Sequence, residues 1–292
     1  MGRRLVIQIT DLHLSAERAY NYAGWQACLD HINRMRPDFV AVTGDLVLCD
    51  PDHAPDHAFV RAELDRIDAP WAALPGNHDL GDSGPSPYMG QFITDSRRAR
   101  WLAHFGADRW TRDLGAWRLI GINAQLLGSD LDTETEQNEW LDGVLHEAAG
   151  RPVALFLHKP LFVEHAAEID SPVFAVTGAG RAPIMDLLAG TDLRLVACGH
   201  NHCYRTVQRG RTAIVWGPST GQLVAEEAPY QGIHEPGLVH YWLDDDGLEF
   251  ALVKPAGIVA SDNTRLVEQH RAMRFTPLFS VEQALAALRA AE

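Results

Sequence analysis

Side chains that could bind a metal ion follow several short apolar runs of this sequence. They occur as Asp-Leu-His at 11–13, Gly-Asp at 44–45, Gly-Asn-His-Asp at 76–79, a histidine at 158 and Gly-His-Asn-His at 199–202. A single aspartate after a strand is usually a turn former, and a single histidine is usually a structural residue. Five such groups in one chain are too many for that explanation, so the pattern predicts a site that does chemistry.

The candidate ligands are nitrogen and oxygen donors, with no thiolate among them. They are Asp11, His13, Asp45, Asn77, His158, His200 and His202. This mixture of donors suits manganese, iron, cobalt or zinc ions. It is unlike the ligand set of a closed, cysteine-rich structural zinc site. Because seven ligands exceed the four that one tetrahedral ion takes, two divalent or trivalent transition-metal ions are predicted. A carboxylate such as Asp45 can bridge two ions about 3.5–4 Å apart, the spacing of two-metal phosphatases and nucleases.

The apolar runs before these groups are short and nearly continuous, which is typical of strands buried on both faces. They cover Leu5–Thr10, Phe39–Thr43, Trp71–Leu74, Trp117–Ile122, Val153–Leu157 and Leu193–Ala197. Since ligands of open α/β sheets bind beyond the carboxyl ends of the strands, the polar groups are expected to meet there. The pairs 11/13 and 200/202 are each two residues apart, which predicts that both members share one face of an extended chain.

Between the predicted strands, apolar residues recur at helical spacing. This pattern ends after residue 200. The predicted helices are Trp25–Met35, Ala58–Ile67 and Glu136–Glu147, the last with Thr133 or Thr135 as its N-cap. Arg211–Gly217 and Gly237–Lys254 then predict strands without helices between them, with a hairpin turn at 244–247. We therefore predict an α/β fold of two packed mixed sheets flanked by helices, a four-layer α/β/β/α sandwich.

Charge and composition narrow the class of partner. The 292 residues include 25 Lys and Arg against 39 Asp and Glu, a formal net charge of −14. A surface this negative repels polyphosphate, which disfavours long nucleic acid and anionic membranes as partners. Four irregularly spaced cysteines and the lack of a long apolar segment predict a reduced, cytoplasmic protein. A small anionic substrate stays compatible because two metal ions would supply local positive charge.

In their order along residues 11–202, these motifs resemble those of the calcineurin-like metallophosphoesterase superfamily. Their spacing is similar to that of its class III cyclic-nucleotide phosphodiesterase and glycerophosphodiesterase branch. The resemblance implies the metallophosphatase fold and assigns the ligands. It places Asp11, His13 and His202 on a first metal, Asn77, His158 and His200 on a second, and Asp45 on both.

The same resemblance implies that His78 faces the substrate and that Asp79 orients the His78 ring. A metal-bridging hydroxide would attack phosphorus in line, and His78 would protonate or stabilise the leaving alkoxide. Relatives often carry an aspartate where this chain has Asn123, a departure that bears on specificity if that position shapes the substrate pocket.

The predicted activity is hydrolysis of a small phosphodiester: a cyclic nucleotide, a glycerophosphodiester or a phosphonate ester. A phosphomonoesterase on the same scaffold is the first alternative, because the metal ligands do not distinguish a phosphodiesterase from a phosphomonoesterase. A nuclease is disfavoured by the net charge. A non-catalytic metal-binding interaction module is disfavoured because His78 is present.

Two parts of the chain match no motif of the branch. Residues 1–254 form the predicted catalytic domain, and 255–292 form a C-terminal extension that ends in an amphipathic helix. Its apolar residues predict packing on the core or on a partner subunit, as in a homodimer or higher homo-oligomer. The Gly/Pro/Ser-rich stretch Gly81–Gly90 predicts an irregular loop. That loop and residues 160–180 are expected to line the mouth of the pocket.

Overall fold

The computed structural model of the chain describes residues 2–84, 90–223, 231–245 and 247–261. The strands are β1 (Arg4–Ile9), β2 (Phe39–Thr43), β3 (Trp71–Leu74), β4 (Trp110–Leu114), β5 (Trp117–Gly121), β6 (Pro152–Phe156), β7 (Asp192–Cys198), β8 (Arg205–Arg209), β9 (Thr212–Trp216), β10 (Leu238–Leu243) and β11 (Leu248–Val253). The helices are α1 (Tyr22–Met35), α2 (Ala54–Leu64), α3 (Asn77–Leu80), α4 (Asp95–Phe105), α5 (Asp132–Glu147) and α6 (Gly178–Leu188), with a 3-10 turn η2 (Ala124–Leu126).

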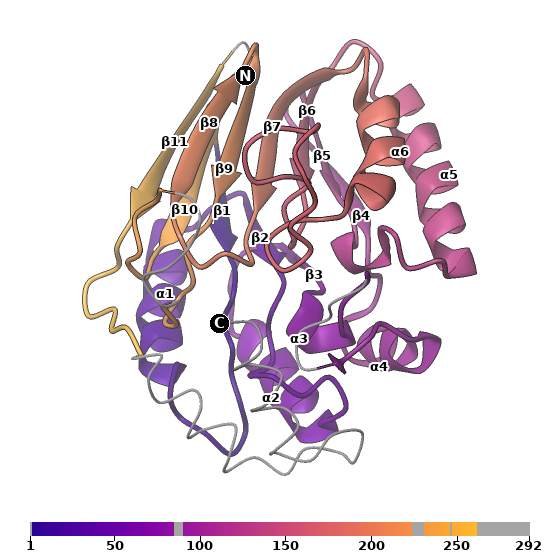
Figure 1. The fold of residues 1–292 in the computed structure, drawn as a ribbon. Coiled ribbons are helices and arrows are strands. Elements are labelled where there is room, and N and C mark those ends of the chain that lie inside the picture. Colours follow the sequence, from indigo (N-terminus) through magenta and orange to yellow (C-terminus); the bar gives the residue numbers. More distant parts are fainter. Residues whose placement is uncertain (1, 85–89, 224–230, 246, 262–292) are drawn as a thin grey trace.

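The strands form two mixed sheets, seen side by side in Figure 1. The first sheet has the order β11-β10-β1-β2-β3, in which β1, β2 and β3 are parallel to one another. Strand β10 pairs antiparallel with both β1 and β11. The second has the order β4-β5-β6-β7-β9-β8, in which β5, β6, β7 and β9 are parallel. The parallel strands of each sheet end at the same edge, which brings the residues that follow them together.

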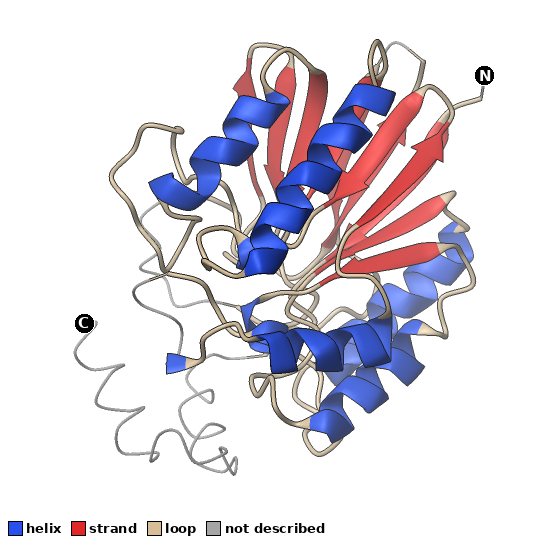
Figure 2. Ribbon diagram, turned by 90° about the vertical axis from the view of Figure 1, so that its right-hand side faces the viewer, coloured by secondary structure: helices blue, strands red, loops and turns tan. Residues whose placement is uncertain are grey.

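Three apolar layers hold the four layers of secondary structure together. The layer between the sheets contains Val6 and Ala41 from the first and Phe156 and Val215 from the second. A second layer packs α1, α2 and α4 on the first sheet, and a third packs α5 and α6 on the second. Figure 2, seen from the side of α5 and α6, shows these two helices covering the outer face of the second sheet. The predicted α/β/β/α sandwich is confirmed.

The six strands predicted before residue 200 are present, with bounds that differ by at most one residue. The hairpin also turns where predicted, since the Asp244 N–H donates to the Gly247 carbonyl oxygen at 3.0 Å. The N-cap predicted for α5 is wrong, because the helix begins at Asp132 and both threonines lie inside its first turn. The Glu134 carboxylate accepts the backbone N–H groups of residues 128–130, which lie just before the first residue of the helix.

Helix α6 and helix α4 have no counterpart among the predicted helices. Gly178, Gly180 and Pro183 are poor helix formers, and they make the sequence of α6 read as a loop. Burial of Ile184 and Leu188 against the second sheet offsets that low propensity. Gly180 is needed for the packing, because a Cβ there would lie 2.8 Å from the Leu127 backbone. The amphipathic helix predicted within 255–292 lies outside the described residues.

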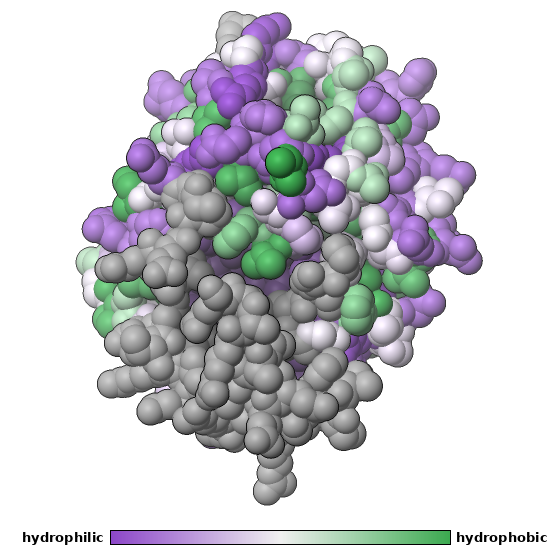
Figure 3. Space-filling view, in the orientation of Figure 1, coloured by the Kyte–Doolittle hydropathy of each residue, from purple (hydrophilic) through white to green (hydrophobic). Residues whose placement is uncertain are grey.

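Hydrophilic and hydrophobic side chains are mixed on the described surface (Figure 3). In Figure 3, hydrophilic side chains predominate on the face that is coloured, and hydrophobic ones form small groups. Scattered apolar residues are normal on protein surfaces. Within the described ranges, no helix has both the length and the apolar composition needed to cross a bilayer.

A histidine pair links α1 to the first sheet. The Nε2 atoms of His31 and His240 lie 3.1 Å apart, and Arg34 Nη2 lies 3.3 Å from His31 Nδ1. Burial, with His31 nearby, lowers the pKa of His240 from 6.5 to about 4. Burial and Arg34 also lower the pKa of His31. Both rings are therefore neutral in the folded protein at neutral pH.

We expect this pair to make the protein less stable in mild acid. Because the folded-state pKa of His240 lies below the unfolded-state value, the unfolded chain binds more protons between these two values. The stabilisation is complete above pH 6.5 and is lost as the pH falls towards 4. His240→Gln should flatten the dependence of the unfolding free energy on pH, measured by urea denaturation. His146→Gln on the exposed face of α5 is the control, and an unchanged slope in His240→Gln would contradict the expectation.

Candidate metal centre

The candidate ligands meet at the carboxyl ends of the parallel strands, on the side of α2 and α3 in Figure 1. They come from both sheets: Asp11 and His13 follow β1, Asp45 follows β2, Asn77 opens α3 after β3, His158 follows β6, and His200 and His202 follow β7. The structure thus brings together all seven residues that the motifs single out.

One group consists of Asp11, His13, Asp45 and His202, whose donor atoms lie within 4.8 Å of one another. The Nε2 atoms of His13 and His202 are 3.0 Å apart, and Asp11 Oδ1 lies 3.2 Å from His202 Nε2. Asp11 Oδ1 is buried and has no hydrogen-bond partner among the described residues. A buried carboxylate oxygen and imidazole nitrogens that converge in this way fit a cation.

The second group consists of Asp45, His158 and His200, with Asn77 beside them. His158 Nε2 lies 3.3 Å from Asp45 Oδ2, 3.2 Å from Asn77 Oδ1 and 3.3 Å from His200 Nδ1. Asp45 Oδ2 is also 3.8 Å from His13 Nε2 in the first group. One carboxylate therefore belongs to both groups.

Backbone carbonyl oxygens fix the histidine rings. The nitrogen of each ring that points away from the centre lies at a carbonyl oxygen: His13 Nδ1 at Leu48 (3.2 Å), His158 Nδ1 at Thr43 (2.7 Å), His200 Nε2 at Val173 (2.7 Å) and His202 Nδ1 at Gln222 (3.1 Å). A carbonyl accepts only from an N–H, so the other nitrogen of each neutral ring carries a lone pair towards the centre. This is how proteins prepare imidazoles for metal binding.

The backbone of the centre is strained. Asp11, His13, Asp45, His200 and His202 have φ between 46° and 70°, in the left-handed region that residues other than glycine rarely adopt. The ligand pairs are therefore not on extended chain, and the prediction of a shared strand face is wrong. Left-handed turns aim the two members of each pair at the centre instead. Such strain typically marks a functional site.

Two glycines let the ligand segments approach one another. Gly44 has a φ of +89°, and a Cβ there would lie 2.5 Å from His158 Nδ1. A Cβ on Gly76 would lie 2.2 Å from Asp45 Oδ1. The Gly-Asp and Gly-Asn-His-Asp motifs therefore need their glycines for steric reasons.

Burial and charge shift the pKa values of these groups in opposite directions. Burial, with the neighbouring imidazoles, lowers the pKa of His13 and of His200 to about 3 each. Burial also disfavours a charged His158, but the Asp45 carboxylate outweighs it and raises the pKa of His158 to about 9. Burial raises the pKa of Asp45, yet His158 and His78 outweigh that and hold it well below its usual range. A metal ion bound at His158 has to displace a proton.

His78 and Asp79 lie beside the centre with different roles. The His78 backbone N–H donates to Asp45 Oδ1 at 2.8 Å, and its ring Nε2 lies 3.9 Å from Asp45 Oδ2. Its Nδ1 donates to the Leu48 carbonyl oxygen at 2.7 Å. The Leu48 carbonyl oxygen therefore holds the ring on its Nδ1 side.

The Asp79 carboxylate joins two ligand-bearing segments. It accepts the backbone N–H groups of Leu46, Val47 and Gly76 at 2.8–3.0 Å. Burial and the nearby Asp45 raise the pKa of Asp79 to about 7. Asp79 thus ties the segment after Asp45 to the start of α3, which carries Asn77.

Asn123 is buried, and its contacts explain why an amide stands there. Its Nδ2 donates to Asp108 Oδ2 at 3.1 Å, and its Oδ1 accepts the Gln125 N–H at 3.0 Å. An aspartate would place a second carboxylate against Asp108. Gln125 in turn donates to the Gly81 carbonyl oxygen at 3.1 Å and contacts Asp82 Oδ1 at 3.3 Å.

Segment 160–180, expected at the mouth of the pocket, contacts the candidate centre. The Val173 carbonyl oxygen accepts from His200, and the Phe174 carbonyl oxygen accepts from Asn201 Nδ2 at 3.2 Å. Of the other expected segment, residues 85–89 lie outside the described residues.

Lys159 is a residue that the motifs did not single out. Its buried ammonium lies 2.9 Å from both carboxylate oxygens of Asp82, which is also buried. Lys159 directly follows His158, and Asp82 follows the helix that carries Asn77. The ion pair therefore joins two segments of the second ligand group. Only the position of the lysine next to His158 could have signalled it.

Lys159→Met is expected to destabilise the protein by about 3–5 kcal/mol, because it leaves the Asp82 carboxylate buried without its counterion. Lys159→Met combined with Asp82→Asn should recover part of this loss. Urea denaturation of the single variants and the double variant measures the coupling. Equal stabilities of Lys159→Met and the wild type would show that the pair is not needed.

Solved metallophosphatases share this fold. A dimetal phosphatase from Danio rerio matches with a TM-score of 0.62 and 14% identity, over 85% of this chain and 95% of that chain. A purple acid phosphatase from yellow lupin (Lupinus luteus) matches with a TM-score of 0.64 and 17% identity, over 96% and 57%. These likenesses define the class of fold.

The family model described as Calcineurin-like phosphoesterase matches residues 5–204, and the chain belongs to this family. The family predicted from the motifs is confirmed. Glycerophosphodiester phosphodiesterase GpdQ of Enterobacter lignolyticus is 27% identical over 251 residues, 81% of this chain and 82% of that protein. A probable cyclic nucleotide phosphodiesterase of Psychrobacter arcticus is 27% identical over 75% of this chain and 81% of that protein. The human serine/threonine-protein phosphatase CPPED1 is 25% identical over 59% and 56%.

Proposed function

We propose that the protein is a dinuclear-metal-dependent hydrolase of a small phosphodiester. The observation that carries the proposal is the Asp45 carboxylate, which lies 3.3 Å from His158 Nε2 and 3.8 Å from His13 Nε2 and so belongs to both ligand groups. A shared carboxylate between two sets of nitrogen and oxygen donors suits a pair of transition-metal ions.

In this proposal the ligands divide as the two groups do. Asp11, His13 and His202 hold one ion, Asn77, His158 and His200 hold the other, and Asp45 is common to both. When bound, such ions supply positive charge for the phosphate oxygens and lower the pKa of coordinated water.

His78 is proposed to act on the leaving group. Its Nδ1 is held by the Leu48 carbonyl, so the ring presents Nε2 on the side of Asp45. In the protonated ring, this Nε2–H can donate to the leaving alkoxide. The buried Asp79 supports the reaction indirectly, by holding the segments that carry Asp45 and Asn77.

A diester is favoured over a monoester by the relatives. The glycerophosphodiesterase and the cyclic nucleotide phosphodiesterase each align over three quarters or more of this chain, whereas CPPED1 aligns over 59%. A small substrate is favoured by the net charge of −14, which disfavours binding of long nucleic acid. A phosphomonoesterase is the competing function.

Hydrolysis assays with metal-reconstituted protein test the proposal. The substrates are bis-p-nitrophenyl phosphate, p-nitrophenyl phosphate, glycerophosphocholine and 3′,5′-cyclic AMP, each with manganese, iron, cobalt or zinc. We expect metal-dependent turnover with a higher kcat/KM for the diesters. A preference for p-nitrophenyl phosphate would favour the monoesterase, and no turnover with any metal would contradict both enzyme functions.

A further inference from the structure

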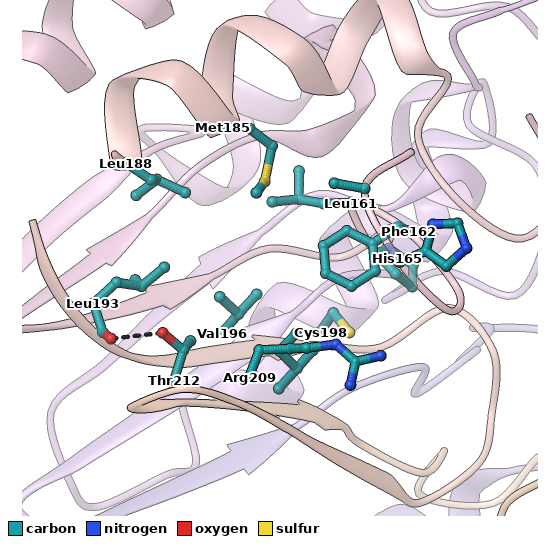
Figure 4. Close-up of a pocket in the computed structure, with 13 residues that line it drawn as sticks. Leu161, Phe162, His165, Met185, Leu188, Leu193, Val196, Cys198, Arg209 and Thr212 are labelled. Atoms are coloured by element: carbon teal, nitrogen blue, oxygen red, sulfur yellow. Dashed lines mark hydrogen bonds between the residues drawn. The ribbon is translucent and has the colours of Figure 1, made fainter. Parts of the chain in front are cut away.

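A cavity separate from the candidate centre lies on the outer face of the second sheet. It has a volume of about 280 Å³ and is shown in Figure 4. Its walls come from the segment after β6, from α6 and from the strands β7, β8 and β9. None of the seven candidate ligands lines it.

The topology explains why the cavity exists. Helices α5 and α6 cover the part of the sheet near β6 and β7 (Figures 1 and 2), and the order β7-β9-β8 extends the sheet beyond them. Side chains of β7 and β9 that face outwards, such as Val196 and Ile214, form the floor. Residues 160–166 form a wall facing α6 across the cavity, and the space between them is left unfilled.

The lining separates an apolar interior from a polar rim. Figure 4 shows Met185, Leu188, Leu193 and Val196 around one end, and the His165 ring and the Arg209 guanidinium at the other. The one hydroxyl of the lining, on Thr212, donates to the Leu193 carbonyl oxygen at 2.8 Å. The interior thus offers apolar contacts, and the charge stands at its rim.

Arg209 places a positive charge at the rim of the cavity. Its Nη2 donates to the Glu164 backbone carbonyl oxygen at 2.9 Å, a neutral acceptor that leaves the positive charge uncompensated by this bond. A guanidinium has five N–H donors in a planar fork that matches a carboxylate or a phosphate. A cationic ligand would be repelled at this rim, and a neutral apolar ligand would gain nothing from it.

We propose that this cavity binds a free single-chain amphiphile with an anionic head group. The hydrocarbon tail occupies the apolar interior, and the carboxylate or phosphate head pairs with Arg209. The volume is about twice that of the roughly 150 Å³ apolar cavity that holds a benzene molecule, so a tail of medium length fits. The proposal does not depend on the phosphodiesterase function, because the cavity shares no residue with the candidate ligands.

Isothermal titration of the full-length protein with decanoate, below its micellar concentration, tests the proposal. We expect one decanoate per chain and a negative heat-capacity change, which marks burial of apolar surface. Decanol tests the head group and should bind at least about tenfold more weakly, while decyltrimethylammonium should not bind. Decyl phosphate should bind as decanoate does. Absence of saturable decanoate binding, or equal affinity for decanol, would overturn the proposal.

Variants locate the bound molecule. Arg209→Gln should weaken decanoate binding at least about tenfold and leave decanol binding unchanged. Arg211→Gln is the matched control, because its side chain is 71% exposed on the same hairpin and does not line the cavity. Met185→Trp should fill the interior and abolish binding, and Ala166→Trp on the loop wall provides a second filling variant if the first does not fold. Undiminished decanoate binding in either filling variant that folds would place the site elsewhere and overturn the proposal.

Discussion

Asp45→Ala is expected to remove both metal ions and to reduce hydrolytic activity to background. The reason is geometric, because Asp45 Oδ2 lies 3.3 Å from His158 Nε2 and 3.8 Å from His13 Nε2. No other residue belongs to both ligand groups in the described part of the chain. Loss of this one carboxylate also removes the negative charge that offsets the charge of two cations, so neither ion should be retained.

Metal content per chain, measured by emission spectroscopy beside kcat, tests this expectation. Asp45→Asn keeps the size of the side chain. It also keeps an oxygen that can accept the hydrogen bond from the His78 backbone N–H, which is 2.8 Å long in the wild type. It therefore separates loss of charge from loss of shape. Asp50→Ala, five residues further along the same segment, is the control and should keep both ions. If Asp45→Ala retained one tightly bound ion, the carboxylate would serve a single metal and the dinuclear proposal would fail.

The sequence allowed the ligand residues to be predicted because their types and their places after strands are local properties. Short apolar runs fix where the strands end, and parallel strands end at one edge. How the ligands reach the centre is not a local property. Asp11 and His13 adopt left-handed φ values of 53° and 46°, and the surrounding structure must compensate for that strain. No spacing rule anticipates such a conformation for an aspartate and a histidine.

Groups that support the ligands were also beyond prediction, because they come from distant parts of the chain. The Leu48 carbonyl accepts from both His13 and His78, and nothing in a leucine residue signals this. The contacts of Asp79 are a second example. Its neighbour in sequence is His78, but its carboxylate points to the backbone of Leu46 and Val47 in another segment. Nothing in the sequence signals these contacts with a distant segment.

The shared Leu48 carbonyl bears on how His78 can act. Because Nδ1 is the donor in that 2.7 Å hydrogen bond, the neutral ring has no proton on Nε2, the atom nearer Asp45 Oδ2. Donation of a proton to a leaving alkoxide therefore requires the doubly protonated ring.

His78→Ala is accordingly expected to separate metal binding from turnover. Both ions should stay bound, because His78 donates to Asp45 through its backbone N–H, which alanine retains. Loss of a general acid typically lowers the rate about 10²–10⁴-fold, and we expect that loss for glycerophosphocholine, whose leaving alkoxide needs a proton. The loss should be much smaller for bis-p-nitrophenyl phosphate, because p-nitrophenolate is a weak base. Emission spectroscopy and kcat on both substrates measure the effect. Loss of metal in His78→Ala would make His78 a ligand, and equal losses on the two substrates would exclude it as the acid.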